Sequence, residues 1–236
     1  MIRTFFAALL LVAAAPADVT ITPLVHSSVQ LESGGVVVQV DPWSKADLSR
    51  AKPADLILVT DDPIHHLDPD AIRKLRKPGA PVLLPAASQP KFPDGTVIAN
   101  GETRTINGIT VEAIPAYDIK PGEPSHPKGK ANGYLVTMGG KKIYFAGVTE
   151  CVAEMRAQRD VDVAFVPMNL PLERMAPAAA AACTNLFAPK VVYVYHYDQT
   201  WASSGRPMAN VAATLDAFRG ALKSGIEFRA AEWYPH

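Results

Sequence analysis

The stretch that most restricts the fold of this chain is Asp55-Leu-Ile-Leu-Val-Thr-Asp-Asp-Pro-Ile-His-His-Leu-Asp68. Its apolar run, residues 56–59, is short and β-branched at two positions, which is typical of a buried strand. Pro63 cannot donate a hydrogen bond to a sheet, so the strand must end before it. Asp68 followed by Pro69 predicts the start of a helix, with the aspartate as N-cap. The polar residues between them therefore lie on a loop after a strand, where α/β sheets usually place their chemistry.

The predicted elements change in character along the chain. Gly-Gly and Asn-Gly turns predict hairpins in the first part, and short apolar strands alternate with helices in the second. The expected strands are 20–26, 29–32, 36–40, 56–59, 81–85, 102–106, 109–114, 133–138, 142–146, 161–167, 191–195 and 226–229. The expected helices are 69–77, 149–158, 177–187 and 208–223, and the expected loops are 85–95 and 115–132. This order predicts one domain, residues 18–236, with two β-rich layers and helices outside.

Residues 1–17 are predicted to be a signal peptide. Arg3 supplies a small positive region, residues 5–14 are apolar, and Ala15-Pro-Ala17 is a small-residue cleavage motif. The apolar segment is shorter than the roughly 20 residues that span a bilayer, so cleavage is favoured over anchoring. We therefore expect a periplasmic or secreted protein with no membrane association after cleavage.

The charge and the cysteine content of the chain say little about its binding partners. The chain has 23 basic and 23 acidic residues, so its charge gives no indication of a nucleic-acid or anionic-membrane partner. A small-molecule substrate or ligand is the expected partner. Cys151 and Cys183 could pair in an oxidising compartment, which the sequence leaves open. Taken singly, each is expected to pack as a buried thiol.

Histidines supply the candidate chemistry. His65 and His66 follow the strand at 56–59, and His196 follows a second apolar strand at 191–195. If both strands belong to one sheet, these three imidazoles can meet at one rim. Three imidazoles with one open position form a known catalytic zinc arrangement.

Motifs spread over nearly all of residues 18–236 carry a resemblance to a known family. They are Val25-His-Ser-Ser28, Asp41-Pro-Trp43, the run from Thr60 to Asp68, Ala116-Tyr117, His126-Pro, Gly133-Tyr134, Tyr144-Phe-Ala-Gly-Val-Thr-Glu150 and His196-Tyr197. In this order the chain resembles the metallo-β-lactamase-fold superfamily, and most closely its ascorbate-6-phosphate lactonase-like branch. The resemblance implies a four-layer αββα sandwich with a metal site at one edge of its two sheets.

The metal motifs of that family are altered in this chain. The family's His-x-His-x-Asp-His falls on Asp61, Pro63, His65 and His66, and its Gly-Asp-Thr falls on Gly147-Val-Thr149. Neither proline nor valine offers a ligand atom. The resemblance therefore implies one metal ion at most, in place of the family's bridged pair.

The residues implied for this reduced site are the metal ligands His65, His66 and His196, the accessory ligand His126, and Asp61 as general base or water-holding group. Zinc is the implied ion, with iron or manganese as alternatives. His26 is expected to be structural, as it is in the family.

Three interpretations of the function remain open on the sequence. The first is an exported hydrolase that cleaves a lactone, ester, amide or phosphodiester through one metal ion. The second is a metal-free module that binds a ligand or a partner, since two ligand positions have become apolar. The third is a carboxylate-containing site for iron or manganese built from Asp61, His126 and His196. For His65 and His66, the alternative to metal binding is that they are ordinary loop residues, and the sequence favours neither interpretation.

Overall fold

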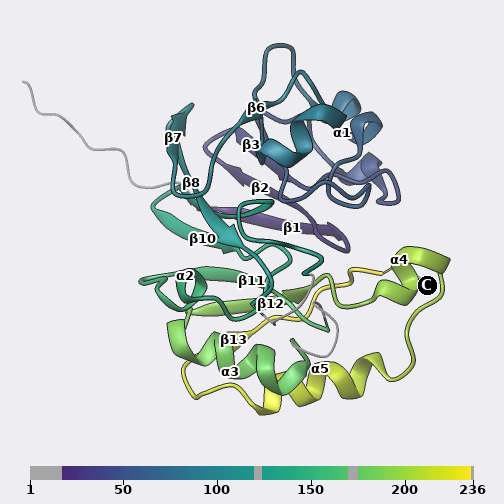
Figure 1. The fold of residues 1–236 in the computed structure, drawn as a ribbon, viewed down its shortest axis with the longest axis vertical. Helices are drawn as coiled ribbons and strands as arrows, with labels where there is room; N and C mark the ends of the chain where they lie inside the picture. Colours follow the sequence, from purple (N-terminus) through teal and green to yellow (C-terminus); the bar gives the residue numbers. More distant parts are fainter. Residues whose placement is uncertain (1–17, 120–123, 170–174, 235–236) are drawn as a thin grey trace, which may run out of the picture.

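Two mixed β-sheets lie at the centre of the molecule, with helices on their outer sides (Figure 1). The structure is a computed structural model that describes residues 18–119, 124–169 and 175–234. The predicted signal peptide, residues 1–17, lies outside the described residues. The layers confirm the expected αββα sandwich.

The first sheet has the order β1-β2-β3-β4-β5-β6. Its strands are β1 (Thr20–Val25), β2 (Ser28–Ser33), β3 (Val36–Val40), β4 (Leu56–Leu58), β5 (Val82–Leu84) and β6 (Thr96–Val97). The first three strands pair antiparallel, and β3 to β6 pair parallel.

The second sheet has the order β13-β12-β11-β10-β9-β8-β7. Its strands are β7 (Thr103–Ile106), β8 (Ile109–Ala116), β9 (Ala131–Met138), β10 (Lys141–Phe145), β11 (Val163–Pro167), β12 (Val191–Tyr195) and β13 (Glu227–Phe228). Strands β7 to β10 pair antiparallel, and β10 to β13 pair parallel. Each sheet therefore has a hairpin part and a parallel part.

Short helices complete the layers. They are α1 (Pro69–Leu75), α2 (Ala153–Arg156), α3 (Pro177–Phe187), α4 (Gln199–Ser204) and α5 (Val211–Gly220), with 3-10 turns η1 (Leu48–Arg50) and η2 (Ala86–Lys91). The predicted start of α1 is confirmed, because the Asp68 carboxylate accepts the backbone N–H groups of Asp70 and Ala71. None of the helices in the described ranges has the length and apolar character needed to cross a membrane.

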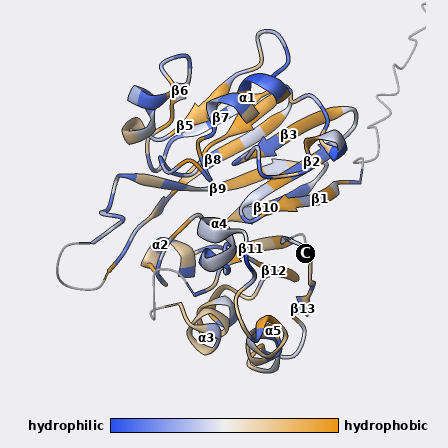
Figure 2. Ribbon diagram, turned by 90° about the vertical axis from the view of Figure 1, so that its right-hand side faces the viewer, coloured by the Kyte–Doolittle hydropathy of each residue, from blue (hydrophilic) through white to orange (hydrophobic). Residues whose placement is uncertain are grey.

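Successive side chains of the central strand β4 pack into two different apolar cores. In β4, Leu56 and Leu58 belong to a core that contains residues of both sheets, whereas Ile57 packs in an outer core with Ile72 of α1. Side chains of successive strand residues point to opposite faces, so a central strand of this sandwich is apolar on both faces. Figure 2 shows the resulting concentration of hydrophobic residues in the strands.

Three local predictions were wrong. The expected loop at 85–95 contains the 3-10 turn η2, and α4 was not expected at all. The expected helix at 149–158 shrinks to α2, because its first residues bond to the end of β8 instead. There Tyr117 donates its backbone N–H to the Thr149 hydroxyl, and Glu150 donates its own to the Tyr117 carbonyl, each at 3.0 Å.

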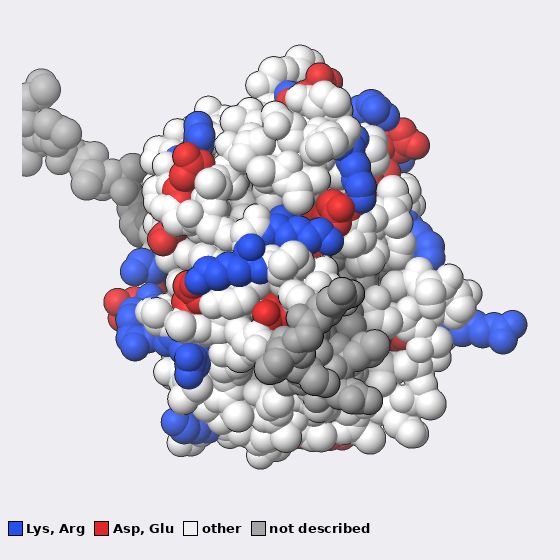
Figure 3. Space-filling model, in the orientation of Figure 1, with Lys and Arg blue, Asp and Glu red and all other residues white. Residues whose placement is uncertain are grey.

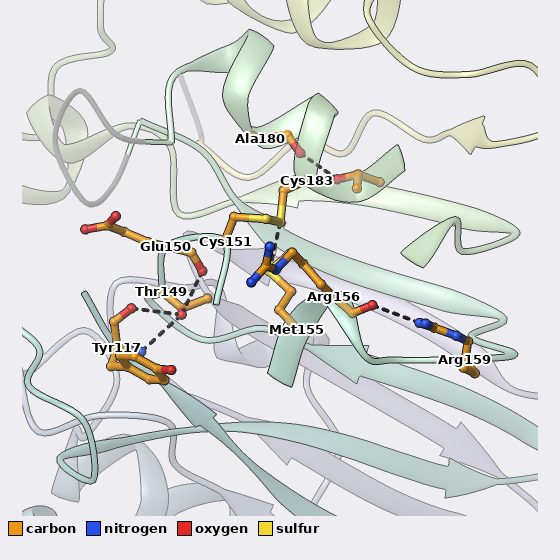
Figure 4. Close-up of a disulfide and its surroundings, with 10 residues drawn as sticks. Tyr117, Thr149, Glu150, Cys151, Met155, Arg156, Arg159, Ala180 and Cys183 are labelled. Atoms are coloured by element: carbon orange, nitrogen blue, oxygen red, sulfur yellow. Dashed lines mark hydrogen bonds between the residues drawn. A yellow bond between two sulfur atoms is a disulfide. The ribbon is translucent and has the colours of Figure 1, made fainter. Parts of the chain in front are cut away.

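The structure decides the state of the two cysteines, which the sequence left open. Cys151 and Cys183 form a disulfide rather than two free buried thiols (Figure 4). The bond joins the loop after β10 to α3, across a sequence separation of 32 residues. The pairing depends on the packing of α3 beside that loop, and no local pattern in the sequence records that packing.

Candidate metal centre

Four histidines meet at the edge of the sandwich where the parallel strands end. His26 lies in the β1–β2 turn, His65 and His66 lie in the β4–α1 loop, and His196 directly follows β12. The ring centroids of His26 and His196 are 4.0 Å apart, and those of the other close pairs are separated by 4.5 to 5.2 Å. Residues from three distant parts of the chain therefore share one small volume.

The backbone is bent into unusual conformations at this edge. His26, Asp41 and His196 have φ angles of 56°, 43° and 55°, in the left-handed region that residues with a Cβ atom rarely adopt. Such a conformation costs on the order of 1–3 kcal/mol per residue and persists where surrounding contacts enforce it. One such contact is the 2.9 Å hydrogen bond from the His196 N–H to the His26 carbonyl. These conformations place the imidazoles of His26 and His196, from different sheets, beside each other with their ring planes tilted by 39°.

A buried carboxylate fixes the orientation of His66. The Asp41 Oδ2 atom lies 2.6 Å from His66 Nδ1, and the Oδ1 atom accepts the Thr60 N–H at 2.7 Å. Since Nδ1 faces the carboxylate, Nε2 is left to point into the cluster, where it lies 3.0 Å from His196 Nε2. A carboxylate behind a histidine is the usual support of a metal ligand.

Burial favours the neutral form of three of these imidazoles, those of His26, His65 and His196. Burial lowers the pKa of His26 to about 2 and that of His65 to about 3, and the charges of the neighbouring histidines add to the effect. Burial also lowers the pKa of His196 well below its ordinary value. Neutral imidazole has the free lone pair that a metal ion requires.

The donor set fits a metal ion. His26, His65 and His196 each offer a ring nitrogen, and these nitrogens all lie within 4.8 Å of one another. His66 adds a nitrogen at 3.0 Å from His196. Imidazole donors suit zinc, copper, iron and nickel, whereas magnesium and calcium prefer oxygen ligands.

A second polar group lies beside the histidine cluster and has carboxylates in it. His126 Nε2 is 3.3 Å from Asp61 Oδ2, and His126 Nδ1 is 3.5 Å from Asp118 Oδ2. Burial opposes ionisation of Asp61, but the His126 hydrogen bond and the charge of His66 outweigh it and lower its pKa to about 2. For His126 burial is likewise outweighed, by Asp61 and Asp118, and the pKa is raised.

The structure places the predicted site residues in two groups. His65, His66 and His196 lie together, but the expectation that their two strands share one sheet was wrong, because β4 and β12 belong to different sheets whose edges meet here. His126 and Asp61 lie in the adjacent group and contact each other. The sequence predicted a structural role for His26 and no role for Asp41, although both residues belong to the motifs that carry the resemblance. No sequence signal indicated Gln199. Its amide nitrogen lies 3.2 Å from a ring nitrogen of His26 and 3.2 Å from a ring nitrogen of His196.

The altered motif positions have structural roles. The Pro63 carbonyl accepts the N–H groups of His66 and Leu67, which closes the turn that presents the histidines. Val148 is buried. Gly147, with φ of 71°, donates its N–H to the Tyr195 hydroxyl, and a Cβ atom there would lie 2.8 Å from the Asn132 carbonyl oxygen. The loop that holds a bridging aspartate in the family is therefore preserved here as a scaffold without that ligand.

The approach to the site is partly exposed and charged. His65 and His126 are half-buried, whereas His26, His66 and His196 are buried. Figure 3 shows basic side chains interspersed with acidic ones across the middle of one face. Asp62, beside Asp61, pairs with Lys91 at 3.0 Å and with Lys130 at 3.4 Å.

Comparison with known proteins identifies the family. A family model described as a beta-lactamase superfamily domain matches residues 20–196, from the first strand to the last histidine of the cluster. The chain belongs to the metallo-β-lactamase superfamily. Membership in this superfamily confirms the resemblance and the fold class predicted from the motifs.

Relatives of this superfamily member include proteins described as metal-dependent hydrolases. A UPF0173 metal-dependent hydrolase of Thermococcus kodakarensis is 30% identical over 190 residues, which cover 75% of this chain and 83% of the relative. The crystal structure of a protein from Parabacteroides distasonis, assigned as a metal-dependent hydrolase, is 36% identical with a TM-score of 0.78 and covers 91% of this chain and 93% of its own. The metallo hydrolase Igni18 of Ignicoccus hospitalis, 22% identical, shares the fold with a TM-score of 0.70 over 92% of this chain and 96% of its own. These relatives support membership in a metal-dependent hydrolase family, and the lactonase-like branch stays a prediction.

Proposed function

We propose that this protein is an exported hydrolase that uses one metal ion to cleave a small substrate carrying a lactone, ester, amide or phosphodiester bond. The observation that carries the proposal is the convergence of buried and half-buried imidazoles from the β4–α1 loop and from the end of β12. Relatives described as metal-dependent hydrolases support the same reaction class.

Each residue of the site has a part in this proposal. His65, His66 and His196 hold the ion, and Asp41 orients His66 through its Nδ1 atom. Bound zinc, iron or manganese supplies Lewis acidity and lowers the pKa of water. Asp61, whose pKa is about 2, is ionised near neutral pH and accepts the proton of the attacking water.

His126 acts as an accessory to this step. It lies between Asp61 and Asp118, so it holds the Asp61 carboxylate in place and screens its charge from the second buried carboxylate. The half-buried rings of His65 and His126 mark the side from which a small substrate reaches the site.

A metal-free binding module is the second candidate, and one observation favours it. Protons alone can satisfy the polar contacts of the cluster: the Gln199 amide donates to His196 Nδ1, His196 Nε2–H donates to His66 Nε2, and His66 Nδ1–H donates to Asp41. A histidine cluster connected in this way does not require an ion, and the site would then only bind a ligand or a partner.

The proposal of export rests on the predicted leader and on the disulfide. Disulfides persist in oxidising compartments such as the periplasm and the extracellular space. The Cys151–Cys183 bond therefore agrees with a periplasmic or secreted protein.

Elemental analysis of the purified protein, residues 18–236, tests the proposal. One equivalent of zinc, iron or manganese, with hydrolysis of at least one member of a panel of lactones, esters, amides and phosphodiesters, supports a hydrolase. No metal after supplementation with all three ions supports the binding module. A His65→Ala variant that keeps its full metal content would instead favour the site built from Asp61, His126 and His196.

A further inference from the structure

We infer that His26 is a fourth nitrogen ligand of the metal ion, so that the site is formed by imidazoles alone from three separate segments of the chain. This inference rests on the proposed function, because it concerns the same ion. It goes beyond the family's motifs, which give His26 no place among the ligands.

The position of His26 carries the first part of the argument. Its ring is the closest of all to that of His196, with centroids 4.0 Å apart, and lies 5.2 Å from that of His65. Its available ring nitrogen lies within 4.8 Å of those of His65 and His196. Tetrahedral ligand nitrogens about 2.0–2.1 Å from one zinc ion lie roughly 3.3 Å apart, so these rings must rotate toward one another to share an ion.

The surroundings of His26 resemble those of a supported ligand. Its Nδ1 atom lies 3.0 Å from the Tyr234 hydroxyl, whose oxygen also accepts the Asp198 N–H at 3.1 Å. If Nδ1 carries the proton and donates it to Tyr234, Nε2 is free to face the cluster, as it is in His66 behind Asp41. The amide nitrogen of Gln199 lies 3.2 Å from that Nε2 atom and is the group that the ion would displace.

The backbone of His26 gives independent support. A structural histidine that only filled space could be placed by an ordinary extended backbone, yet His26 and His196 both adopt left-handed φ angles and are joined by the His196 N–H to His26 carbonyl bond. Two strained residues clamped together in this way fix the relative position of their rings. Preorganised ligands are the expected use of such strain at a metal site.

An all-imidazole site has consequences for the choice of ion. Four neutral nitrogens favour zinc, copper and nickel over magnesium, calcium and manganese. They bring no negative charge to the ion, so the buried carboxylates of Asp41 and Asp61 are the groups near the cluster that offset it. Zinc can expand to five ligands, so water would enter as a fifth ligand rather than into an open tetrahedral position.

The test counts imidazole ligands in the copper-loaded and zinc-loaded protein by pulsed electron paramagnetic resonance and X-ray absorption. The inference predicts four imidazoles in the native sequence and three in His26→Gln, with zinc affinity in that variant lowered by more than the roughly 100-fold that loss of an outer partner can cause. Circular dichroism and the intact disulfide check that the variant is folded. The native count needs no variant, so a poorly folded His26→Gln would not leave the inference untested.

Matched controls separate a ligand from a neighbour. His126→Gln removes another histidine near the cluster and is expected to leave the count at four. Tyr234→Phe removes only the partner of His26 and is expected to weaken zinc binding without changing the count. Three imidazoles in the native protein, unchanged in His26→Gln, would overturn the inference and leave the proposed function standing. A native protein that binds no ion would overturn both.

Discussion

The histidine cluster and the group around His126 lie side by side and are both largely buried, yet the pKa values of their histidines are shifted in opposite directions. In the first, burial lowers the pKa of His26, His65 and His196, which keeps these three imidazoles neutral. In the second, the contact between Asp61 and His126 lowers the pKa of the carboxyl and raises that of the imidazole, which favours the charged form of each. Neutral lone pairs suit a cation, and a buried carboxylate beside them suits a proton acceptor. The comparison teaches that neighbouring buried groups on one edge of a fold can be tuned in opposite directions by the charges packed against them.

Replacing the proton acceptor should give the largest change. We expect Asp61→Asn to lower kcat by about 10²–10⁴-fold, the usual contribution of a general base, while metal content stays the same. Steady-state kinetics and elemental analysis on the same preparation measure both. Asp62→Asn, one residue along and paired with surface lysines, is the matched control. Loss of metal from Asp61→Asn would show that the two groups are one site.

Removing the disulfide tests whether the scaffold around both groups is fixed by covalent means. We expect Cys151→Ala combined with Cys183→Ala to lower the free energy of unfolding by about 2–4 kcal/mol, the typical effect of losing a cross-link. Urea unfolding of the double variant and of the native protein gives the difference. Equal unfolding midpoints would show that packing of α3 alone holds the loop after β10.

Weakening the support of a ligand should affect only the histidine cluster. We expect Asp41→Asn to weaken zinc binding by about 10–100-fold, because an amide holds the Nδ1–H of His66 less strongly than a carboxylate does. Competition with a chelator of known affinity measures the change. Unaltered affinity would mean that His66 is not a ligand.

The pH dependence of stability should have opposite signs in the two groups. His26 has a folded pKa of about 2 against an ordinary value of 6.5, so below pH 6.5 the unfolded chain binds a proton that the folded chain does not. The metal-free protein should therefore lose about 1.4 kcal/mol for each pH unit below 6.5 through this residue alone. Urea unfolding at pH 7 and pH 5 should show a shallower pH dependence in His26→Gln.

The raised pKa of His126 acts in the reverse direction. Its contribution is fully present below the ordinary pKa of histidine and is lost as the pH rises through the raised folded value. His126→Gln should therefore reduce the stability of the metal-free protein more at pH 5 than at pH 8. A loss that is equal at both values would contradict the ion pair with Asp61.

The sequence was informative where the signal is local. The helix start at Asp68 and Pro69 depends on bonds within a few residues, and the hairpin turns depend on glycine and asparagine at fixed positions. It was less informative for residues 149–158, where the pattern predicts a helix but Thr149 forms a hydrogen bond with the distant Tyr117 instead. The disulfide lay beyond any local signal for the same reason.

By itself the sequence determined the class of fold, the strand-ending loops that carry His65, His66 and His196, and the loss of ligand atoms at Pro63 and Val148. Only the tertiary structure decided that His26 joins these histidines while His126 turns to Asp61 and Asp118. The physical reason is that a side chain's partners at this edge are set by how two sheets pack and by strained backbone at two residues. Neither leaves a periodic mark in the chain.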